Sequence, residues 1–187
     1  MREAGEPFPL VVVSTDEEDA IVPYALVARS ASGEQRHEGV LSTVRWAVRV
    51  FAWTVDPRED EAGWRAEAEQ AVAFEVPDLD LAYGMGGASQ LAGLPQAVAA
   101  ANLPGDRFGT LAEARVRLPQ GRWMLTVTSD DGVRVKVDDE SVLEDWTWHA
   151  PRTGSEVIDG GREVRLEVEH FELDGFAVLR LAIERAE

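Results

Sequence analysis

The chain has 187 residues, no cysteine and a formal net charge of −17 at pH 7. Without cysteine it has no disulfides, thiolate metal sites or cysteine nucleophiles, and its negative charge makes nucleic acid and anionic membranes poor partners, because neutralising phosphates takes clustered Lys and Arg. The first residues, Met-Arg-Glu-Ala-Gly-Glu, contain no apolar signal-peptide core, and no stretch approaches the ~20 apolar residues that span a bilayer, so we expect a soluble chain without membrane insertion or an export signal of its own.

Three runs in the first half of the chain are typical of short strands: 9–14, 21–28 and 43–53. In the third run, alternate positions are apolar and predict one buried face, formed by Val44, Trp46, Val48 and Val50. We assign residues 1–39 to an N-terminal extension, either an extra edge strand pair or the end of a preceding domain, with the polar segment 29–38 as the connector. Residues 40–187 then form the main domain.

Two segments between these runs and the second half favour helix. Residues 56–71 are acidic at their start and rich in Ala and Glu, and residues 95–101 suit a helical turn before Asn-Leu-Pro-Gly. We therefore expect at most one or two short helices.

From residue 110 onward, apolar and polar residues alternate with the period of two that is typical of half-buried strands. The alternation covers residues 113–118, resumes at 123–127 after a Pro-Gln-Gly turn, and continues at 133–137 after Ser-Asp-Asp-Gly. Residues 144–161 are rich in turn formers and are expected to be a loop. The final two strands are expected to bury Val164, Leu166, Val168 and His170, and then Ala177, Leu179, Leu181 and Ile183. This pattern predicts an all-β protein, either an antiparallel β-sandwich or a barrel.

The segment 121–146 resembles the central signature of PA14 domains, in which a strand ends in Ser-Asp-Asp-Gly, a second strand follows, and a turn leads to Asp-Trp. Further similar segments follow the family's order at residues 79–84, 106–108 and 169–175. The resemblance covers roughly residues 40–187 and implies a PA14-like antiparallel β-sandwich, a module of adhesins, toxins, glycosidases and other extracellular proteins that often binds glycans.

The resemblance also implies a site. In glycan-binding members, two aspartates joined by a cis peptide hold a calcium ion that also contacts sugar hydroxyls, and the matching positions here are Asp130 and Asp131. A second loop completes the site, often through an Asn, and its counterpart is residues 172–175, which contain no Asn.

The residue types suit a hard cation, because calcium takes about 6–8 oxygen ligands from carboxylates, carbonyls and water. We assign Asp130, Asp131 and Asp174 as metal ligands, and add Trp148 and Glu172 as ligand-binding residues, with Glu172 as the alternative third carboxylate. The competing interpretation is that residues 129–132 are only a polar turn, since Asp and Gly are common turn residues.

Aromatic residues near this site allow two interpretations. Trp146, Trp148 and His149 can form a stacking platform for a sugar, or Trp146 can belong to the core, as large aromatic residues usually do. His170 shares the inward register of Val168 and is expected to be a hydrogen-bonded core histidine.

No nucleophile elbow, zinc-protease motif or phosphate-binding loop is present, so we predict that the chain is not an enzyme. We predict a non-catalytic, monomeric module of a larger exported protein, extracellular or in the cell envelope, that binds carbohydrate with the help of calcium. The alternative is a structural or protein-interaction sandwich without a small-molecule ligand.

Overall fold

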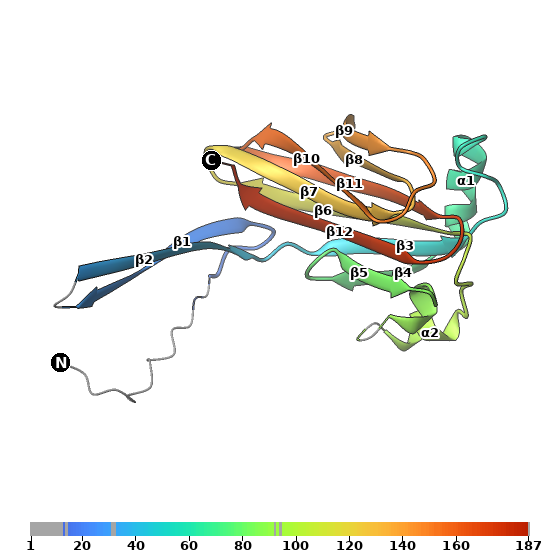
Figure 1. Cartoon of the computed structure of the whole chain (residues 1–187), viewed down its shortest axis with the longest axis horizontal. Helices are drawn as coiled ribbons and strands as arrows, with labels where there is room; N and C mark the ends of the chain where they lie inside the picture. The colour runs from blue at the N-terminus through green and yellow to red at the C-terminus, as the bar shows by residue number, and fades with distance from the viewer. Residues whose placement is uncertain (1–12, 14, 31–32, 92, 94, 187) are drawn as a thin grey trace.

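The computed structural model describes residues 13, 15–30, 33–91, 93 and 95–186 (Figure 1). Two antiparallel sheets pack face to face, and the predicted β-sandwich is confirmed. The larger sheet has the strand order β4-β3-β6-β11-β8-β9, and the smaller has the order β10-β7-β12-β5. The larger sheet contains β3 (Trp46–Ala52), β4 (Val72–Val76), β6 (Phe108–Leu118), β8 (Val133–Val137), β9 (Glu140–Asp145) and β11 (Arg162–Glu172). The smaller contains β5 (Asp80–Gly84), β7 (Arg122–Asp130), β10 (Arg152–Asp159) and β12 (Ala177–Arg185).

The core lies between the sheets and is built from the alternating apolar residues of both. Val164, Leu166 and Val168 of β11 face Leu125 and Val127 of β7 within one continuous cluster of buried side chains. Burying every second residue of a strand removes one face of the sheet from water while the polar face stays solvated. Alternation in the sequence therefore located this core correctly.

A separate hairpin of β1 (Ile21–Ser30) and β2 (Gly33–Ser42) projects from one end of the sandwich (Figure 1). The strand expected at 21–28 is present, but the expected connector 29–38 is not irregular where it is described, because residues 29–30 and 33–38 belong to the paired strands of this hairpin. The expected boundary between residues 39 and 40 falls inside β2. The run expected at 9–14 lies outside the described residues, except for Val13, which is not in a strand.

The short helices occur where they were expected, but several strands were missed, among them β2, β4, β5 and β10. Residues 56–71 contain α1 (Glu61–Glu67) followed by a 3-10 turn (Ala68–Gln70), and residues 95–101 contain α2 (Gln96–Ala100). A second 3-10 turn (Ala88–Gln90) was not predicted. The expected loop 144–161 holds β10, whose burial pattern shows no clean period of two and so gave no strand signal. In the described part of the chain, no helix has the length and hydrophobicity needed to cross a bilayer.

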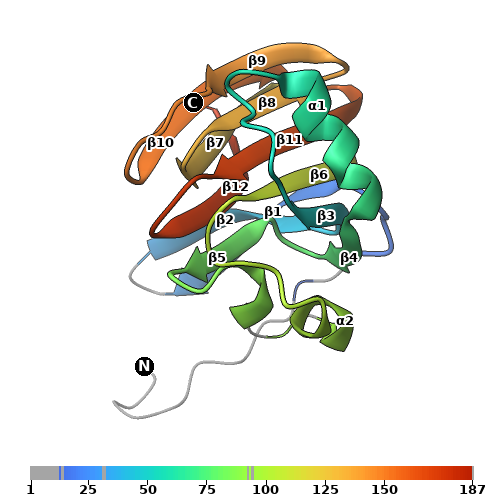
Figure 2. The ribbon, with the colours of Figure 1, turned by 90° about the vertical axis from the view of Figure 1, so that its right-hand side faces the viewer.

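Helix α1 lies against one end of the sandwich (Figure 2) and is fixed there by packing and by ion pairs. Its Trp64 is fully buried against Phe51, with ring centroids 5.3 Å apart. The Glu61 carboxylate accepts a hydrogen bond from Arg134 of β8 at 2.9 Å, and Arg134 also donates to the buried Glu169 of β11 at 3.1 Å. These contacts hold the segment preceding α1 beside the loop between β9 and β10.

The base of the β1–β2 hairpin is anchored and its outer part is exposed, so the two parts should respond differently to truncation. Ile21 is 3% exposed within the main core, whereas Val27 is 42% exposed. We expect Ile21→Ala to lower the free energy of unfolding by roughly 2–4 kcal/mol, as cavity-forming substitutions do. Val27→Ala, the matched control, should change it by less than about 0.5 kcal/mol. Urea denaturation measures both, and equal effects would show that the hairpin base is not docked.

Candidate functional site

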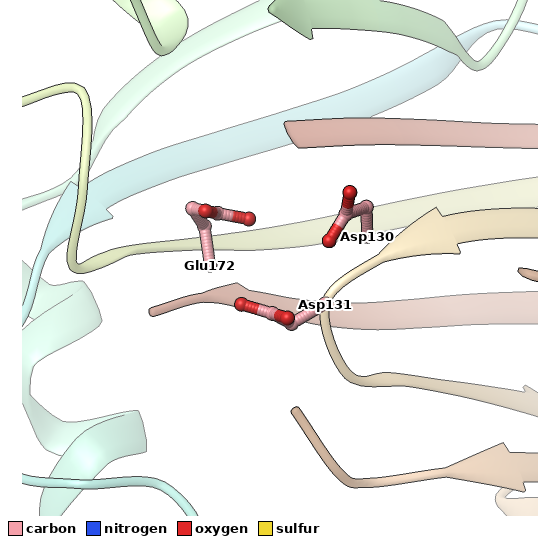
Figure 3. A group of neighbouring side chains, drawn as sticks. All are labelled: Asp130, Asp131 and Glu172. Carbon is pink, nitrogen blue, oxygen red and sulfur yellow. The ribbon is translucent and has the colours of Figure 1, made fainter. Parts of the chain in front are cut away.

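The predicted aspartate pair lies at the end of the sandwich opposite the hairpin, where strands of both sheets terminate. Asp130 is the last residue of β7, Asp131 begins the connection to β8, and Glu172 is the last residue of β11. Their side chains point toward one another (Figure 3), and one carboxylate oxygen from each lies within 4.8 Å of the others. Within the described residues this is the one group of three or more potential metal ligands that comes so close together.

All three carboxylates are removed from bulk solvent. Asp130 is 5% exposed, and Asp131 and Glu172 are 0% exposed. The peptide bond between Asp130 and Asp131 is cis, as the resemblance implies. Acidic side chains are almost never fully buried unless they are paired, so three buried together need a specific explanation.

Backbone amides from two other loops hold the Asp131 side chain. Its Oδ1 accepts a hydrogen bond from the His149 amide at 3.0 Å, and its Oδ2 accepts one from the Leu173 amide at 2.8 Å. Asp131 thereby joins the loop between β7 and β8 to the β9–β10 and β11–β12 loops. Gly132 is required beside it, because a Cβ there would lie 2.1 Å from the Phe171 ring.

Glu172 has no such partners, since neither of its carboxylate oxygens makes a hydrogen bond within the described structure. Burial and the neighbouring charges of Asp131 and Asp130 raise the pKa of Glu172 to about 9. Burial and the charge of Asp131 raise the pKa of Asp130 to about 6. Burial also raises the pKa of Asp131, although its two amide hydrogen bonds act in the opposite direction. The group therefore carries excess negative potential that a bound cation would neutralise.

His170 is a buried core histidine, as predicted, and its ring contacts the backbone of Asp130. Its Nε2 lies 2.8 Å from the Asp130 carbonyl oxygen, and since a carbonyl can only accept, Nε2 is the donor. Its Nδ1 lies 3.4 Å from the Thr110 hydroxyl, which also contacts the Tyr83 hydroxyl at 2.7 Å. Burial lowers the pKa of His170 to about 4, so the ring is neutral at pH 7.

The three aromatic candidates occupy different environments. Trp146 is half-buried and packs edge-on against Trp64 and Phe171, with centroids 5.5 and 4.9 Å apart, so the core interpretation of this residue is confirmed. His149 is 3% exposed, and its Nδ1 donates to the Ala150 carbonyl at 2.9 Å. Trp148 is 58% exposed and can contact a ligand.

The third carboxylate of the group is Glu172, whereas Asp174 lies outside it. Asp174 is exposed in the turn after β11, and its Oδ1 accepts a hydrogen bond from Trp148 Nε1 at 3.3 Å. Glu172 continues the inward register of Val168 and His170 by one further step of two. Extending that alternation past His170 would have selected Glu172 as the inward acid.

Sequence reasoning also missed Asp106. Its Oδ1 accepts a hydrogen bond from the Gly175 amide at 3.0 Å, which fixes the turn that follows Glu172. The two residues are 69 positions apart in the chain, and no local pattern predicts such a contact.

Comparison with known proteins bears on the predicted resemblance. The PA14 domain model matches residues 96–184, a segment that runs from α2 to within β12. The resemblance to PA14 domains is therefore confirmed over these residues. No curated protein matches the chain in sequence.

Solved structures share the fold at low sequence identity. An anti-sigma factor domain-containing protein is 16% identical with a TM-score of 0.57, and the match covers 76% of this chain and 43% of that one. The PA14 sugar-binding domain from an RTX adhesin is 15% identical with a TM-score of 0.55, covering 75% of this chain and 89% of that one. The PA14 domain of an antifreeze protein is 16% identical with a TM-score of 0.54, covering 75% and 81%.

The PA14 match includes all three converging carboxylates, whereas the β1–β2 hairpin and β3 to β5 precede it. Strands β3, β4 and β5 are nevertheless integral to the sandwich. Strand β3 pairs with β6 and β5 pairs with β12, both in the matched segment, and β4 pairs with β3. The structural unit is therefore larger than the segment that carries the family signature.

The raised pKa values predict how the metal-free chain responds to pH. Glu172 binds its proton more tightly in the folded chain, where its pKa is about 9, than in the unfolded chain, where its pKa is near 4.5. The pKa of Asp130 is raised in the same direction, to about 6 in the folded chain. The folded state thus binds more protons across this window, so its stability falls as pH rises from about 5 to 9.

We expect the melting temperature, measured in chelator, to fall over this range. In Glu172→Gln the fall should be much smaller, because Gln does not titrate. The exposed Asp78→Asn serves as the control and should retain the wild-type slope. Parallel curves for wild type and Glu172→Gln would contradict the prediction.

Proposed function

We propose that this chain is a non-catalytic module that binds carbohydrate through a calcium ion held by Asp130, Asp131 and Glu172. The observation that carries the proposal is the convergence of three buried carboxylates, of which Glu172 has no hydrogen-bond partner on either oxygen. Burying like charges without compensation is unfavourable. A divalent cation is the simplest group that would make the arrangement favourable.

The donor set fits calcium better than other common metals. The group consists of carboxylate oxygens, which hard cations prefer, and contains neither a thiolate nor an available imidazole. Three carboxylates supply part of the 6–8 oxygens that calcium takes. Water, carbonyls or a pair of neighbouring sugar hydroxyls can supply the remainder.

Two features favour a sugar as the second ligand. The exposed Trp148 immediately precedes His149, whose amide binds Asp131, and aromatic faces pack well on the apolar faces of sugar rings. The RTX adhesin domain with the same fold is described as sugar-binding.

A binding role suits Asp131, because the two amide hydrogen bonds fix its carboxylate and each oxygen keeps a further lone pair for a cation. Such calcium-assisted modules suit extracellular or cell-envelope proteins, where free calcium is abundant enough for sites of modest affinity. We therefore infer an exported location and a place within a larger protein.

Calcium binding is tested by isothermal titration of the whole chain. Wild type should bind one ion per molecule, and Glu172→Gln and Asp130→Asn should each weaken binding on the order of tenfold or more, because each removes a charged ligand. Calcium at about 100 times its Kd should stabilise the wild type by about 2.7 kcal/mol. Asp78→Asn, which removes an exposed acid, is the matched control.

If neither heat nor a calcium-dependent rise in melting temperature is observed, the ion site does not exist. The alternative of a sandwich that serves only structure or protein interaction would then stand.

Carbohydrate recognition is tested on a glycan array in calcium and in chelator. Binding should require calcium and should fall about three- to tenfold in Trp148→Ala, through loss of the ring contact. Calcium binding without any glycan signal would show that the ion is structural only.

A further inference from the structure

The exposed large apolar side chains of this chain are not spread evenly. Among the described residues they are Met85, Trp148 and Phe176 at the carboxylate end, and Val27 and Val40 in the hairpin. Met85 is 72% exposed and Phe176 46%. Clustered exposed apolar residues mark binding surfaces more often than single ones do.

Strand order places the three apolar residues at the carboxylate end in a line. The smaller sheet has the order β10-β7-β12-β5. At the carboxylate end, Trp148 lies in the loop that leads into β10, Asp130 ends β7, Phe176 immediately precedes β12, and Met85 immediately follows β5.

The strand registers confirm that these positions share one edge. Arg152 at the start of β10 pairs with Ser129, Asp130 pairs with Val178 of β12, and Ala177 pairs with Gly84 of β5. The edge therefore presents, in order, an exposed tryptophan, the ion-site carboxylate, an exposed phenylalanine and an exposed methionine. Three strand spacings of about 4.8 Å give this edge a length of about 14 Å.

Hydrogen bonds hold the loops along this edge in place. Trp148 donates to Asp174, and the Gly175 amide donates to Asp106, so two residues of the turn before Phe176 are anchored. A ligand contact made on such anchored loops requires less ordering when the ligand binds.

From this edge, and resting on the proposed carbohydrate function, we propose that the site takes a linear, neutral oligosaccharide rather than a single sugar. One ring shares the ion with Asp130, Asp131 and Glu172, and the following unit packs on Phe176 and Met85. Beyond β7, which carries Asp130, the edge continues over two further strands, β12 and β5, and this length is greater than one sugar ring covers.

The negative charges near this edge favour neutral ligands over anionic ones. Asp174 is exposed in the turn before Phe176, the exposed Asp106 binds the Gly175 amide of that turn, and the chain carries a net charge of −17. Sialylated or sulfated units would therefore be repelled at the positions beyond the ion.

The test compares affinities for two ligands that share the ion. The best-bound linear oligosaccharide of two to four units from an array is titrated against the methyl glycoside of its terminal sugar, both in saturating calcium. Their affinity ratio is insensitive to changes at the ion site, because both ligands depend on it equally.

In wild type the oligosaccharide should bind more tightly, and the ratio should fall about three- to tenfold in Phe176→Ala and by less in Met85→Ala. Val27→Ala, an exposed apolar residue of the distant hairpin, should leave the ratio unchanged. Sialylated or sulfated versions of the same oligosaccharide should bind more weakly than the neutral form.

A wild-type ratio near one, or a ratio that neither Phe176→Ala nor Met85→Ala alters, would overturn the extended site while leaving calcium-dependent sugar binding intact. Binding of calcium with no glycan retained by the array would instead refute the proposed function and the extended site together.

Discussion

The constraint on which the site depends is the burial of Glu172 beside two aspartates without a compensating positive charge. Another buried acid on strand β11, by contrast, is paired with positively charged side chains. Glu169, three residues earlier and 3% exposed, is contacted by Arg65, Arg134 and Lys136. Glu172, on the same strand and fully buried, has no donor on either oxygen within the described structure. The difference lies in the direction of the side chains, since Glu169 faces the layer under α1 and Glu172 ends the inward register.

The rest of the fold supports this small group. The core places the ends of β7 and β11 next to each other, His170 holds the Asp130 carbonyl, and Asp131 ties two loops by their amides. The ion pairs of α1 keep the segment before it against Trp146, whose Nε1 donates to the Pro57 carbonyl at 3.1 Å. Each loop around the carboxylates is therefore held by a buried element of the sandwich.

Sequence alone predicted the sandwich, the aspartate pair and the position of both short helices. The strands and helices depend on local information, namely a period of two and an Ala- and Glu-rich segment, whereas the choice of a sandwich over a barrel and the aspartate site came from the resemblance to PA14 domains. The strand β10 escaped detection because it is a mostly exposed edge strand, so no apolar face marks it.

The composition of the site was harder to predict. Sequence allowed Glu172 or Asp174 as the third carboxylate and assigned Asp174 to the metal, whereas the structure brings Glu172 to the aspartate pair. Asp106 contacts a turn far away in the chain, and only the assembled sheets bring the two together.

The β1–β2 hairpin and the carboxylates lie at opposite ends of the sandwich (Figure 1). Neither outer edge of this two-stranded ribbon pairs with another strand of the described chain. A strand from a neighbouring domain that added to either edge would extend the ribbon without approaching the acidic end. The molecule therefore has two unlike ends, one with unpaired strand edges and the other with buried acids reached by three loops.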